Sequence, residues 1–465
     1  MPARQLDPRF RIHLSTVALA NLADGVVATG VPLLAITLTR SPGLIGVLTA
    51  AVWLPWLLAG IPAGVLVDRW DRRRTMLVAL GLRAALLAVV ALVGAAGALS
   101  IWWLIGFALA YGFTEVFTDL AAQAQVPALV GRDGAALRSA NSRLLAVEQA
   151  AGGFVAPPVA GLLVAVGAAW VTGVPALIVA GAVAVLALGL RGRFTAPRAA
   201  ADVVTAAAGA TRRGALRRDL GEGLSVLWRH RVLRPLLIAA GLWNFGSTAL
   251  SAVFVLWMVG PGSAAGLTPQ EFSLVLLAMP VGGLLGSVVA GPVTARWPEM
   301  RVLVACWGAA ALINLLPLLW PAAWSFALFL MCAGVFGVVG NVVSGSLRPR
   351  MVEERLLGRV HGAARVIGFG AMPLGAVAGG QVAQWFGIPA VFLTVVVLML
   401  LSTAIVAVRV PQSVVDRWEL RPTDSGAAEP DSAPSGRATS ALSSAGSAAA
   451  GSASSIEPEP DPVAA

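Results

Sequence analysis

Long apolar runs separated by short polar breaks make up most of the chain. The runs contain 19 to 30 residues, and about 20 are enough for a helix to cross the hydrocarbon core of a bilayer. The expected spans cover residues 13–38, 43–67, 75–99, 101–124, 142–166, 171–190, 235–259, 272–294, 302–320, 323–347, 357–386 and 388–408. The pattern therefore predicts an all-α integral membrane protein with about twelve transmembrane helices.

Composition excludes a soluble globular protein. Of the 465 residues, 58% are hydrophobic and only 12% are charged, whereas soluble domains have about 45–50% apolar and about 25% charged residues. The net charge is +10 and every basic residue is arginine, but the arginines fall in short loops between spans. We therefore expect the lipid bilayer, and no nucleic acid, as a partner. The cysteines, Cys306 and Cys332, lie in separate apolar segments, so we expect no disulfide framework, metal or cofactor.

Arginines occupy alternate loops, and this asymmetry predicts the orientation of the chain. They gather before the first span and in the loops at 69–74, 132–138, 296–301 and 348–359, while the opposite loops hold little besides Arg40. The positive-inside rule then places both termini in the cytoplasm of a bacterial inner membrane. We expect a first six-helix bundle at 1–190, a cytoplasmic central loop at 191–234, a second six-helix bundle at 235–410 and a disordered cytoplasmic tail at 411–465.

An internal repeat supports two pseudo-symmetric six-helix bundles. Residues 64–74 align with 291–301 and share Gly, Arg, Trp and Arg at matching places, and Asp119 falls opposite Asn341. Paired helical halves around a cavity are a transporter architecture, with the substrate site near the midplane at their interface. We expect a monomer that binds a small-molecule substrate.

The loop after the second span carries a family resemblance. Its Gly64, Asp68, Arg69, Arg72 and Arg73 resemble the signature loop of the major facilitator superfamily, which implies the major facilitator fold. We expect Asp68 to accept hydrogen bonds from a helix N-terminus and to pair with Arg72 or Arg73, so that the loop acts as a conformational latch. The alternative is that the arginines only fix topology.

Two further features resemble one branch of that superfamily. Asp71 stands where the general pattern prefers Gly, which is similar to macrolide, multidrug and siderophore exporters. In the fifth span, Gly153, Pro157, Pro158 and Gly161 resemble the superfamily's antiporter signature, although Pro157 stands where Gly is expected. The resemblance implies export in exchange for protons; ordinary close helix packing is the alternative.

Charged residues inside the spans are the strongest chemical signal. They are Asp24, Arg83, Glu115, Asp119 and Glu148. An ionised side chain at the centre of a bilayer costs roughly 2.5–3.5 kcal/mol on insertion scales, so each needs a partner or a wet cavity. Asp24 is expected to pair with Arg83. Glu115 and Asp119 are four residues apart and should repel each other, which favours one of them holding a proton.

We predict that these five residues couple transport to protons and recognise cations. The alternative is a buried structural network of Asp24, Arg83 and Glu115, with Asp119 and Glu148 near the inner surface. Six further side chains are candidates to line a cavity for a bulky, partly cationic compound, or else serve as packing residues. They are Tyr111, Trp53, Trp56, Trp243, Asn244 and Asn341.

Other functional classes fit the sequence less well. A chain without lysine has no phosphate-binding Gly-Lys-Ser or Gly-Lys-Thr loop, so the energy source would be an ion gradient or the substrate itself. The three histidines, His13, His230 and His361, are scattered and form no catalytic or metal-binding arrangement, so we do not expect an enzyme. The function predicted is proton-coupled export of hydrophobic, drug-like or natural-product compounds by alternating access. An importer of a nutrient or lipid on the same fold is the alternative, and an integral membrane enzyme a more distant one.

Overall fold

Helices account for nearly all of the chain that the structure, a computed structural model, describes: residues 7–194 and 212–419. The first half contains α1 (Pro8–Leu38), α2 (Pro42–Val67), α3 (Arg72–Ala95), α4 (Ile101–Val130), α5 (Gly134–Glu148), the π-helical segment η1 (Gln149–Val155), α6 (Ala156–Val166) and α7 (Ala168–Gly189). The rest contains α9 (Arg212–Arg229), α10 (Leu233–Met258), α11 (Pro269–Leu276), α12 (Ala278–Arg296), α13 (Glu299–Ile313), α14 (Leu316–Leu319), α15 (Ala323–Met351), α16 (Glu354–Phe386), α17 (Ile388–Arg409) and α18 (Gln412–Trp418). Extended structure in these ranges is one isolated bridge, Val259 to Leu267.

Twelve helical segments of the described chain are long and apolar enough to span a membrane, which confirms the predicted fold class. The fifth span is formed by α5, η1 and α6 together and begins at Gly134, earlier than the sequence suggested. Local signals mark several helix starts. Ser41 caps α2 and precedes a proline at its first turn, and Thr268 and Glu271 form a capping box at α11.

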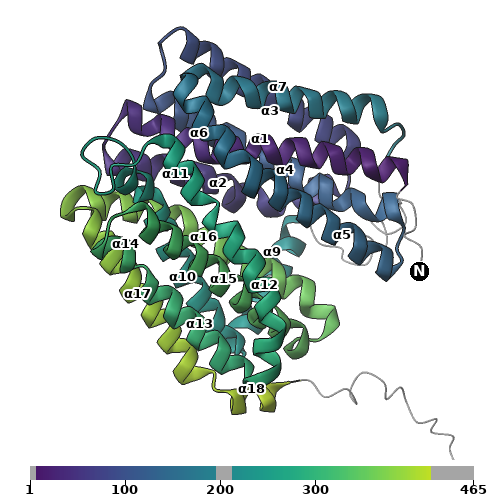
Figure 1. The fold of residues 1–465 in the computed structure, drawn as a ribbon. Helices are drawn as coiled ribbons and strands as arrows, with labels where there is room; N and C mark the ends of the chain where they lie inside the picture. The colour runs from purple at the N-terminus through teal and green to yellow at the C-terminus, as the bar shows by residue number, and fades with distance from the viewer. Residues whose placement is uncertain (1–6, 195–211, 420–465) are drawn as a thin grey trace, which may run out of the picture. The chain divides into compact units, whose positions relative to one another are not determined.

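The same set of helix neighbours recurs in both halves. In the first half α1 packs on α7, α3 on α7, α2 on α4 and α3 on α4; in the second, α10 packs on α17, α13 on α17, α12 on α15 and α13 on α15. Figure 1 shows the purple-to-blue helices gathered together and the green-to-yellow helices gathered together. Both halves belong to one compact unit. The repeat seen in the sequence therefore has a counterpart in the packing of the helices.

The central segment differs from the plain loop expected at 191–234, because its second part forms the helix α9. This helix packs on α16, where Glu222 pairs with Arg359 at 2.5 Å and Leu227 is buried. Amphipathic periodicity within the arginine-rich stretch explains the helix. The tail expected to be disordered from residue 411 begins with the short helix α18, in which Val415 is buried. The expectations for residues 1–6, 195–211 and 420–465 fall outside the described residues.

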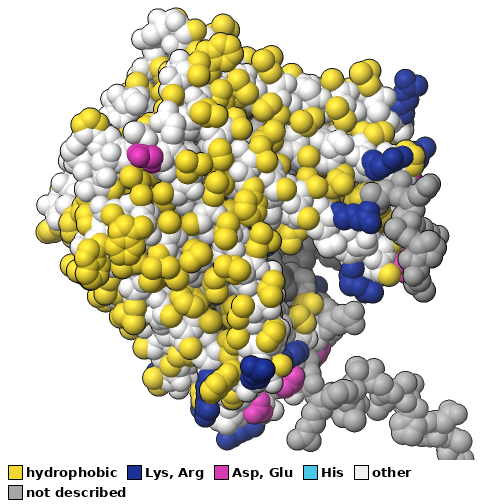
Figure 2. Space-filling model, viewed as in Figure 1, with side chains coloured by type: hydrophobic (Ala, Val, Ile, Leu, Met, Phe, Trp, Pro, Cys, Tyr) yellow, Lys and Arg dark blue, Asp and Glu magenta, His cyan; other side chains and the backbone are white. Residues whose placement is uncertain are grey.

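The two halves meet most closely at the end remote from the arginine-rich loops. A Cβ built on Gly46 of α2 would lie 2.9 Å from the Cα of Gly380 on α16. Gln384 accepts a hydrogen bond from Ser41 at 3.1 Å, and the Arg40 guanidinium donates to the Val259 carbonyl at 2.9 Å. Figure 2 shows the arginines at the opposite margin, while most of the visible face is hydrophobic. In this conformation the halves are joined at the arginine-poor end.

Candidate functional site

An ion pair between α1 and α3 is at the centre of the charged residues. Arg83 donates from Nη1 to both carboxylate oxygens of Asp24, at 2.6 and 2.8 Å. The Arg83 side chain is fully buried, whereas that of Asp24 is 20% exposed. This confirms the pairing that the sequence predicted. Because a buried guanidinium without a counter-charge is very costly, the pair joins the two helices firmly.

α4 completes the cluster. The Tyr111 hydroxyl donates to the Asp24 carboxylate, and the Arg83 guanidinium lies 5.0 Å from the centroid of the Tyr111 ring. One turn further on, Arg83 Nε donates to the Thr114 hydroxyl at 3.3 Å. Nη2 of Arg83 is buried and has no hydrogen-bond partner in the described part of the protein. Three helices therefore hold Asp24 in one place and orientation.

Asp24, Tyr111 and Glu115 all face a cavity of about 440 Å³. Its walls come from α1, α2, α4, η1 and, in the second half, α10, so it lies between the two halves. Apolar side chains such as Val52, Trp53 and Val255 form most of the lining. A mostly apolar cavity with a few convergent polar groups is what small-molecule binding sites have in common.

Glu115 is the cavity carboxylate that the cluster does not hold. It is half-buried on α4, and among the described residues no hydrogen bond or ion pair reaches its side chain. Asp119 lies one turn further along the same helix face, as predicted, and does not line the cavity. Glu148 ends α5 and also lies outside the cavity lining. The structure thus brings Asp24, Arg83, Tyr111 and Glu115 together beside the cavity, whereas Asp119 and Glu148 lie outside its lining.

The antiporter-like segment contains a π-helical turn. The Ala156 amide donates to the carbonyl of Ala151, five residues back, and Pro157 and Pro158 follow without N–H groups, so the preceding carbonyls lose their helical donors. At Gly25 of α1, an added Cβ would lie 2.6 Å from the carbonyl oxygen of Gly152. The small residues therefore allow α1 and η1 to approach closely beside the cavity.

Two glycines of this segment face the second half of the chain. A Cβ on Gly153 would lie 3.5 Å from Pro280 of α12, and one on Gly161 would lie 2.8 Å from Ser273 Cβ of α11. Pro157 is buried and Pro158 half-buried. The segment consequently packs between the halves, next to the cavity wall that Gly152 forms.

Of the predicted cavity aromatics, Tyr111 and Trp53 line the cavity and the others do not. Trp56 stacks on Phe369 of α16, with ring centroids 5.6 Å apart. Trp243 stacks on Trp307 at 5.4 Å. These rings hold helices together, in agreement with the packing alternative.

The predicted polar candidates of the second half lie elsewhere as well. Asn244 donates to the Gly368 carbonyl at 3.3 Å, and Asn341 is exposed. Neither lines this cavity. The described cavity is therefore formed mainly by the first half.

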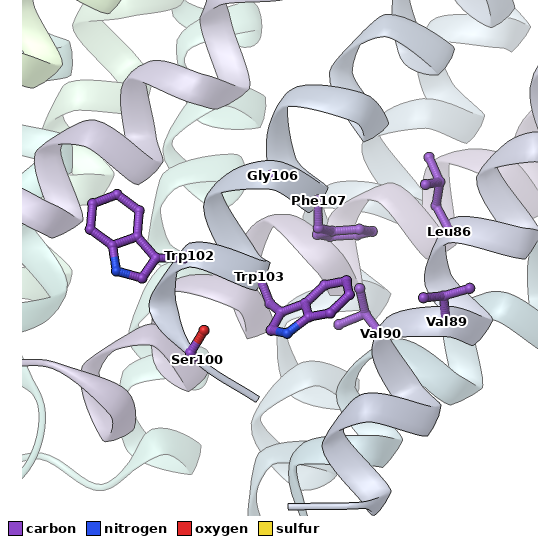
Figure 3. Close-up of a pocket in the computed structure, with 8 residues that line it drawn as sticks. All are labelled: Leu86, Val89, Val90, Ser100, Trp102, Trp103, Gly106 and Phe107. Atoms are coloured by element: carbon purple, nitrogen blue, oxygen red, sulfur yellow. The ribbon is translucent and has the colours of Figure 1, made fainter. Parts of the chain in front are cut away.

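Phe107 separates the cavity from a second pocket, of about 430 Å³, between α3 and α4. Figure 3 shows Trp103 and Phe107 of α4 facing Leu86, Val89 and Val90 of α3. The Phe107 ring packs on Tyr111 with centroids 5.2 Å apart. Phe107 could not be identified from the sequence, because one phenylalanine in an apolar span carries no pattern of its own.

The signature loop is held against the end of α7, and the expected ion pair of Asp68 with Arg72 or Arg73 is absent from the described residues. The Gly64 carbonyl accepts a hydrogen bond from the backbone N–H of Asp68 at the end of α2. The exposed Asp68 carboxylate has no ion-pair partner among the described residues, so the predicted bond to Arg72 or Arg73 is not formed in this conformation. Arg73 instead donates to the carbonyls of Ala187, at 2.9 Å, and Leu190 at the end of α7.

Asp71 has the capping role that was expected of Asp68. Its carboxylate accepts from the Arg74 amide at 2.9 Å, capping α3, and from the Phe194 amide at 2.9 Å. Arg69 is exposed, and Nε of Arg72 is buried without a partner in the described chain. An aspartate directly before a helix start is a recognised N-cap signal, so the sequence held the information for this role.

Comparison with known proteins agrees with this architecture. The chain is 27% identical over 417 residues to the multidrug efflux pump Tap of Mycobacterium tuberculosis, which covers 87% of this chain and 93% of Tap. It is 25% identical over 360 residues to macrolide efflux protein A of Streptococcus pyogenes, covering 76% of this chain and 84% of that protein. The solved structure of the nucleoside transporter NupG has a TM-score of 0.63 at 13% identity, covering 88% of this chain and 100% of NupG. These likenesses confirm the predicted resemblance to the multidrug and macrolide exporter branch. The family model of the Major Facilitator Superfamily matches residues 14–262 and 252–454, and the chain belongs to that superfamily.

Proposed function

We propose that the protein exports hydrophobic, drug-like or natural-product compounds in exchange for protons, by alternating access. The family is one of transporters, and the relatives Tap and macrolide efflux protein A are named for efflux. The observation that carries the proposal is the cavity between the halves, where Glu115 stands beside the Asp24, Arg83 and Tyr111 cluster.

Charge balance in the cavity provides the coupling. Arg83 compensates one carboxylate, that of Asp24, which leaves the Glu115 carboxylate to be neutralised by another positive species. In a membrane-embedded cavity an uncompensated charge costs a few kcal/mol. A proton or the cationic group of a substrate can each supply that charge, and since both need the same carboxylate they exclude one another. Such competition is the basis of exchange.

The roles of the acids then divide between structure and transport. Asp24 is held by Arg83 and Tyr111, which suits a positioning role in which it fixes the cavity wall. Glu115 is the exchangeable group. Asp119, one turn from Glu115 on the same face, is a second proton-binding group, and Glu148 stays a weaker candidate because it lies outside the cavity lining.

Alternating access follows from where the halves touch. The backbone of Gly46 approaches that of Gly380 at the arginine-poor end, and the positive-inside rule assigns the opposite, arginine-rich end to the cytoplasm of a bacterial cell membrane. Both termini are then cytoplasmic, and this conformation is the inward-facing one. Transport requires these contacts to open, and the signature loop of Gly64, Asp68, Arg69, Arg72 and Arg73 acts as the latch, with Asp68 finding a partner in the outward-facing state.

The test is accumulation of labelled macrolides, cationic dyes and siderophores in cells that express the protein, with and without a protonophore. Glu115→Gln should abolish protonophore-sensitive loss of the substrate, because the amide binds neither a proton nor a cation. Glu148→Gln tests the weaker candidate in parallel, since Glu148 lies outside the cavity lining, and should lose much less export than Glu115→Gln.

Three outcomes would count against the proposal. Export that persists in Glu115→Gln would remove that residue from the coupling. Export that is indifferent to the protonophore would exclude protons as the driving ion. Accumulation that rises on expression would make the protein an importer.

A further inference from the structure

A groove of about 700 Å³ lies on the surface of the first half, between α3, α4 and the loop that joins α2 to α3. One end is lined by Arg69 and Arg74 and the other by Val78, Leu82 and Phe113. Of the residues that line it, the transport cycle described above uses Arg69 alone, as part of the proposed latch. Its lining has the two chemistries of an amphipathic ligand, a cationic end and an apolar channel.

The cationic end has donors to spare. Arg69 and Arg74 are exposed, and no carboxylate in the described part of the chain forms an ion pair with either. Asp71, which also lines this end, already accepts two backbone N–H groups.

The other charged groups of the loop do not neutralise the positive charge at this end of the groove. Arg73 is bonded to carbonyls of α7, and Asp68 and Arg72 lie outside the groove lining. Two guanidinium groups that line the same end of a groove are suited to bind the oxygens of a phosphate.

The apolar channel has the length of a lipid segment. Arg74, Val78 and Leu82 are spaced four residues apart, so they follow one face of α3 for about 12 Å. Val78 is 71% and Leu82 55% exposed, and Phe113 and Phe117 of α4 form the facing wall. A free phosphate would make no use of such a channel, whereas an acyl chain would fill it.

We propose that this groove is a binding site for an anionic phospholipid of the leaflet at the arginine-rich end. The phosphate binds Arg69 and Arg74, and one acyl chain lies along Val78 and Leu82. Trp70, stacked on Phe117 at 6.0 Å, lies at the boundary between headgroup and chain, where an indole is well accommodated.

The site connects to the charged cluster through one residue. Thr114 lines the groove, and its hydroxyl accepts the hydrogen bond from Arg83 Nε. A bound acyl chain therefore packs against the helix turn that holds the Asp24–Arg83 pair. Lipid binding itself does not depend on the proposed transport function, so the two can be tested separately.

The experiment is native mass spectrometry of the full chain in detergent, titrated with dioleoyl phosphatidylglycerol or with dioleoyl phosphatidylcholine. Arg69→Gln combined with Arg74→Gln should weaken phosphatidylglycerol binding about tenfold or more, because charge-assisted hydrogen bonds are lost. It should weaken phosphatidylcholine binding clearly less, because the choline cation already offsets the charge of that lipid's phosphate. The matched control is Arg296→Gln with Arg301→Gln, two exposed arginines at the equivalent loop of the second half, which should have little effect.

A second pair of variants tests the channel without changing charge. Leu82→Trp fills it and should weaken binding of phosphatidylglycerol, while Leu92→Trp, at a 70% exposed position on the same helix outside the groove, should not. This pair keeps the test valid even if the arginine variant does not fold.

The proposal is overturned if both arginine variants bind phosphatidylglycerol like the wild type or lose it equally. It is also overturned if inorganic phosphate alone displaces the lipid, which would make the groove a simple anion site. Displacement by an uncharged hydrophobic compound as effective as the lipid itself would instead assign the groove to a drug.

Discussion

The buried pair of Asp24 and Arg83 allows a quantitative prediction about stability. Replacing one partner leaves the other uncompensated, which for buried pairs costs about 3–5 kcal/mol. The two single variants should differ, because Arg83 is fully buried and Asp24 is 20% exposed. A guanidinium cannot give up its proton in a protein, whereas a carboxylate facing the cavity can take one up.

Asp24→Asn should therefore destabilise the protein by an amount near that range, and Arg83→Met by clearly less. The arginine variant loses two hydrogen bonds to Asp24 and one to Thr114. The Asp24 carboxylate that remains can take up a proton, and it keeps its hydrogen bond from Tyr111. The double variant removes both charges and should be more stable than Asp24→Asn alone. This double-mutant cycle isolates the coupling between the two residues.

The assay is unfolding of purified protein in detergent, followed by tryptophan fluorescence for the wild type, both single variants and the double variant under one set of conditions. The order of stability expected is wild type, then Arg83→Met and the double variant, then Asp24→Asn. An Arg83→Met variant less stable than Asp24→Asn, or a double variant no more stable than Asp24→Asn, would contradict this assignment of the costs.

Three further predictions concern other parts of the molecule. Gly46→Val should suppress transport without loss of expression, because its Cβ would lie 2.7 Å from the Ala376 carbonyl oxygen and keep the halves apart; normal transport would contradict this contact. Asp71→Ala should lower stability by about 1 kcal/mol through loss of the α3 cap, and Asp71→Asn by less, as read by thermal unfolding. Burial lowers the pKa of His230 below its ordinary 6.5, and its neutral Nδ1 accepts hydrogen bonds from two backbone N–H groups at the start of α10. The contribution of His230 to folding stability should therefore be complete above about pH 6.5 and be lost as the pH falls through the lowered pKa. A melting temperature that varies with pH equally in wild type and His230→Asn would exclude that role.

Sequence patterns predicted the spans well because a bilayer restricts the choice of structure. Backbone groups in the hydrocarbon must bond within the segment, so apolar runs of sufficient length form helices. The start of the fifth span was placed at 142, eight residues later than Gly134, because α5 begins in a polar stretch that carries Arg138 and Arg143. Hydropathy does not register a helix that extends beyond the membrane.

Within the site, chemistry was more predictable than position. A buried carboxylate and a buried guanidinium on neighbouring helices have strong reasons to meet, so Asp24 and Arg83 could be paired from the sequence. Aromatic residues have no such requirement. Trp56 and Trp243 pack equally well against other rings as against a ligand, and only the packing of whole helices decides which of them faces the cavity.

The signature loop shows how two similar residues exchange roles. Asp68 and Asp71 are both acidic and three positions apart, but only Asp71 directly precedes the first turn of α3, where amide groups need an acceptor. The exposed Asp68 carboxylate therefore has no ion-pair partner among the described residues in this conformation. Since Arg73 is bonded to carbonyls, which hold it less strongly than a carboxylate would, a rearrangement that lets Asp68 reach it would gain a charged pair. We therefore propose a second state of the loop in which Arg73, which caps α7 in this conformation, pairs with Asp68 instead.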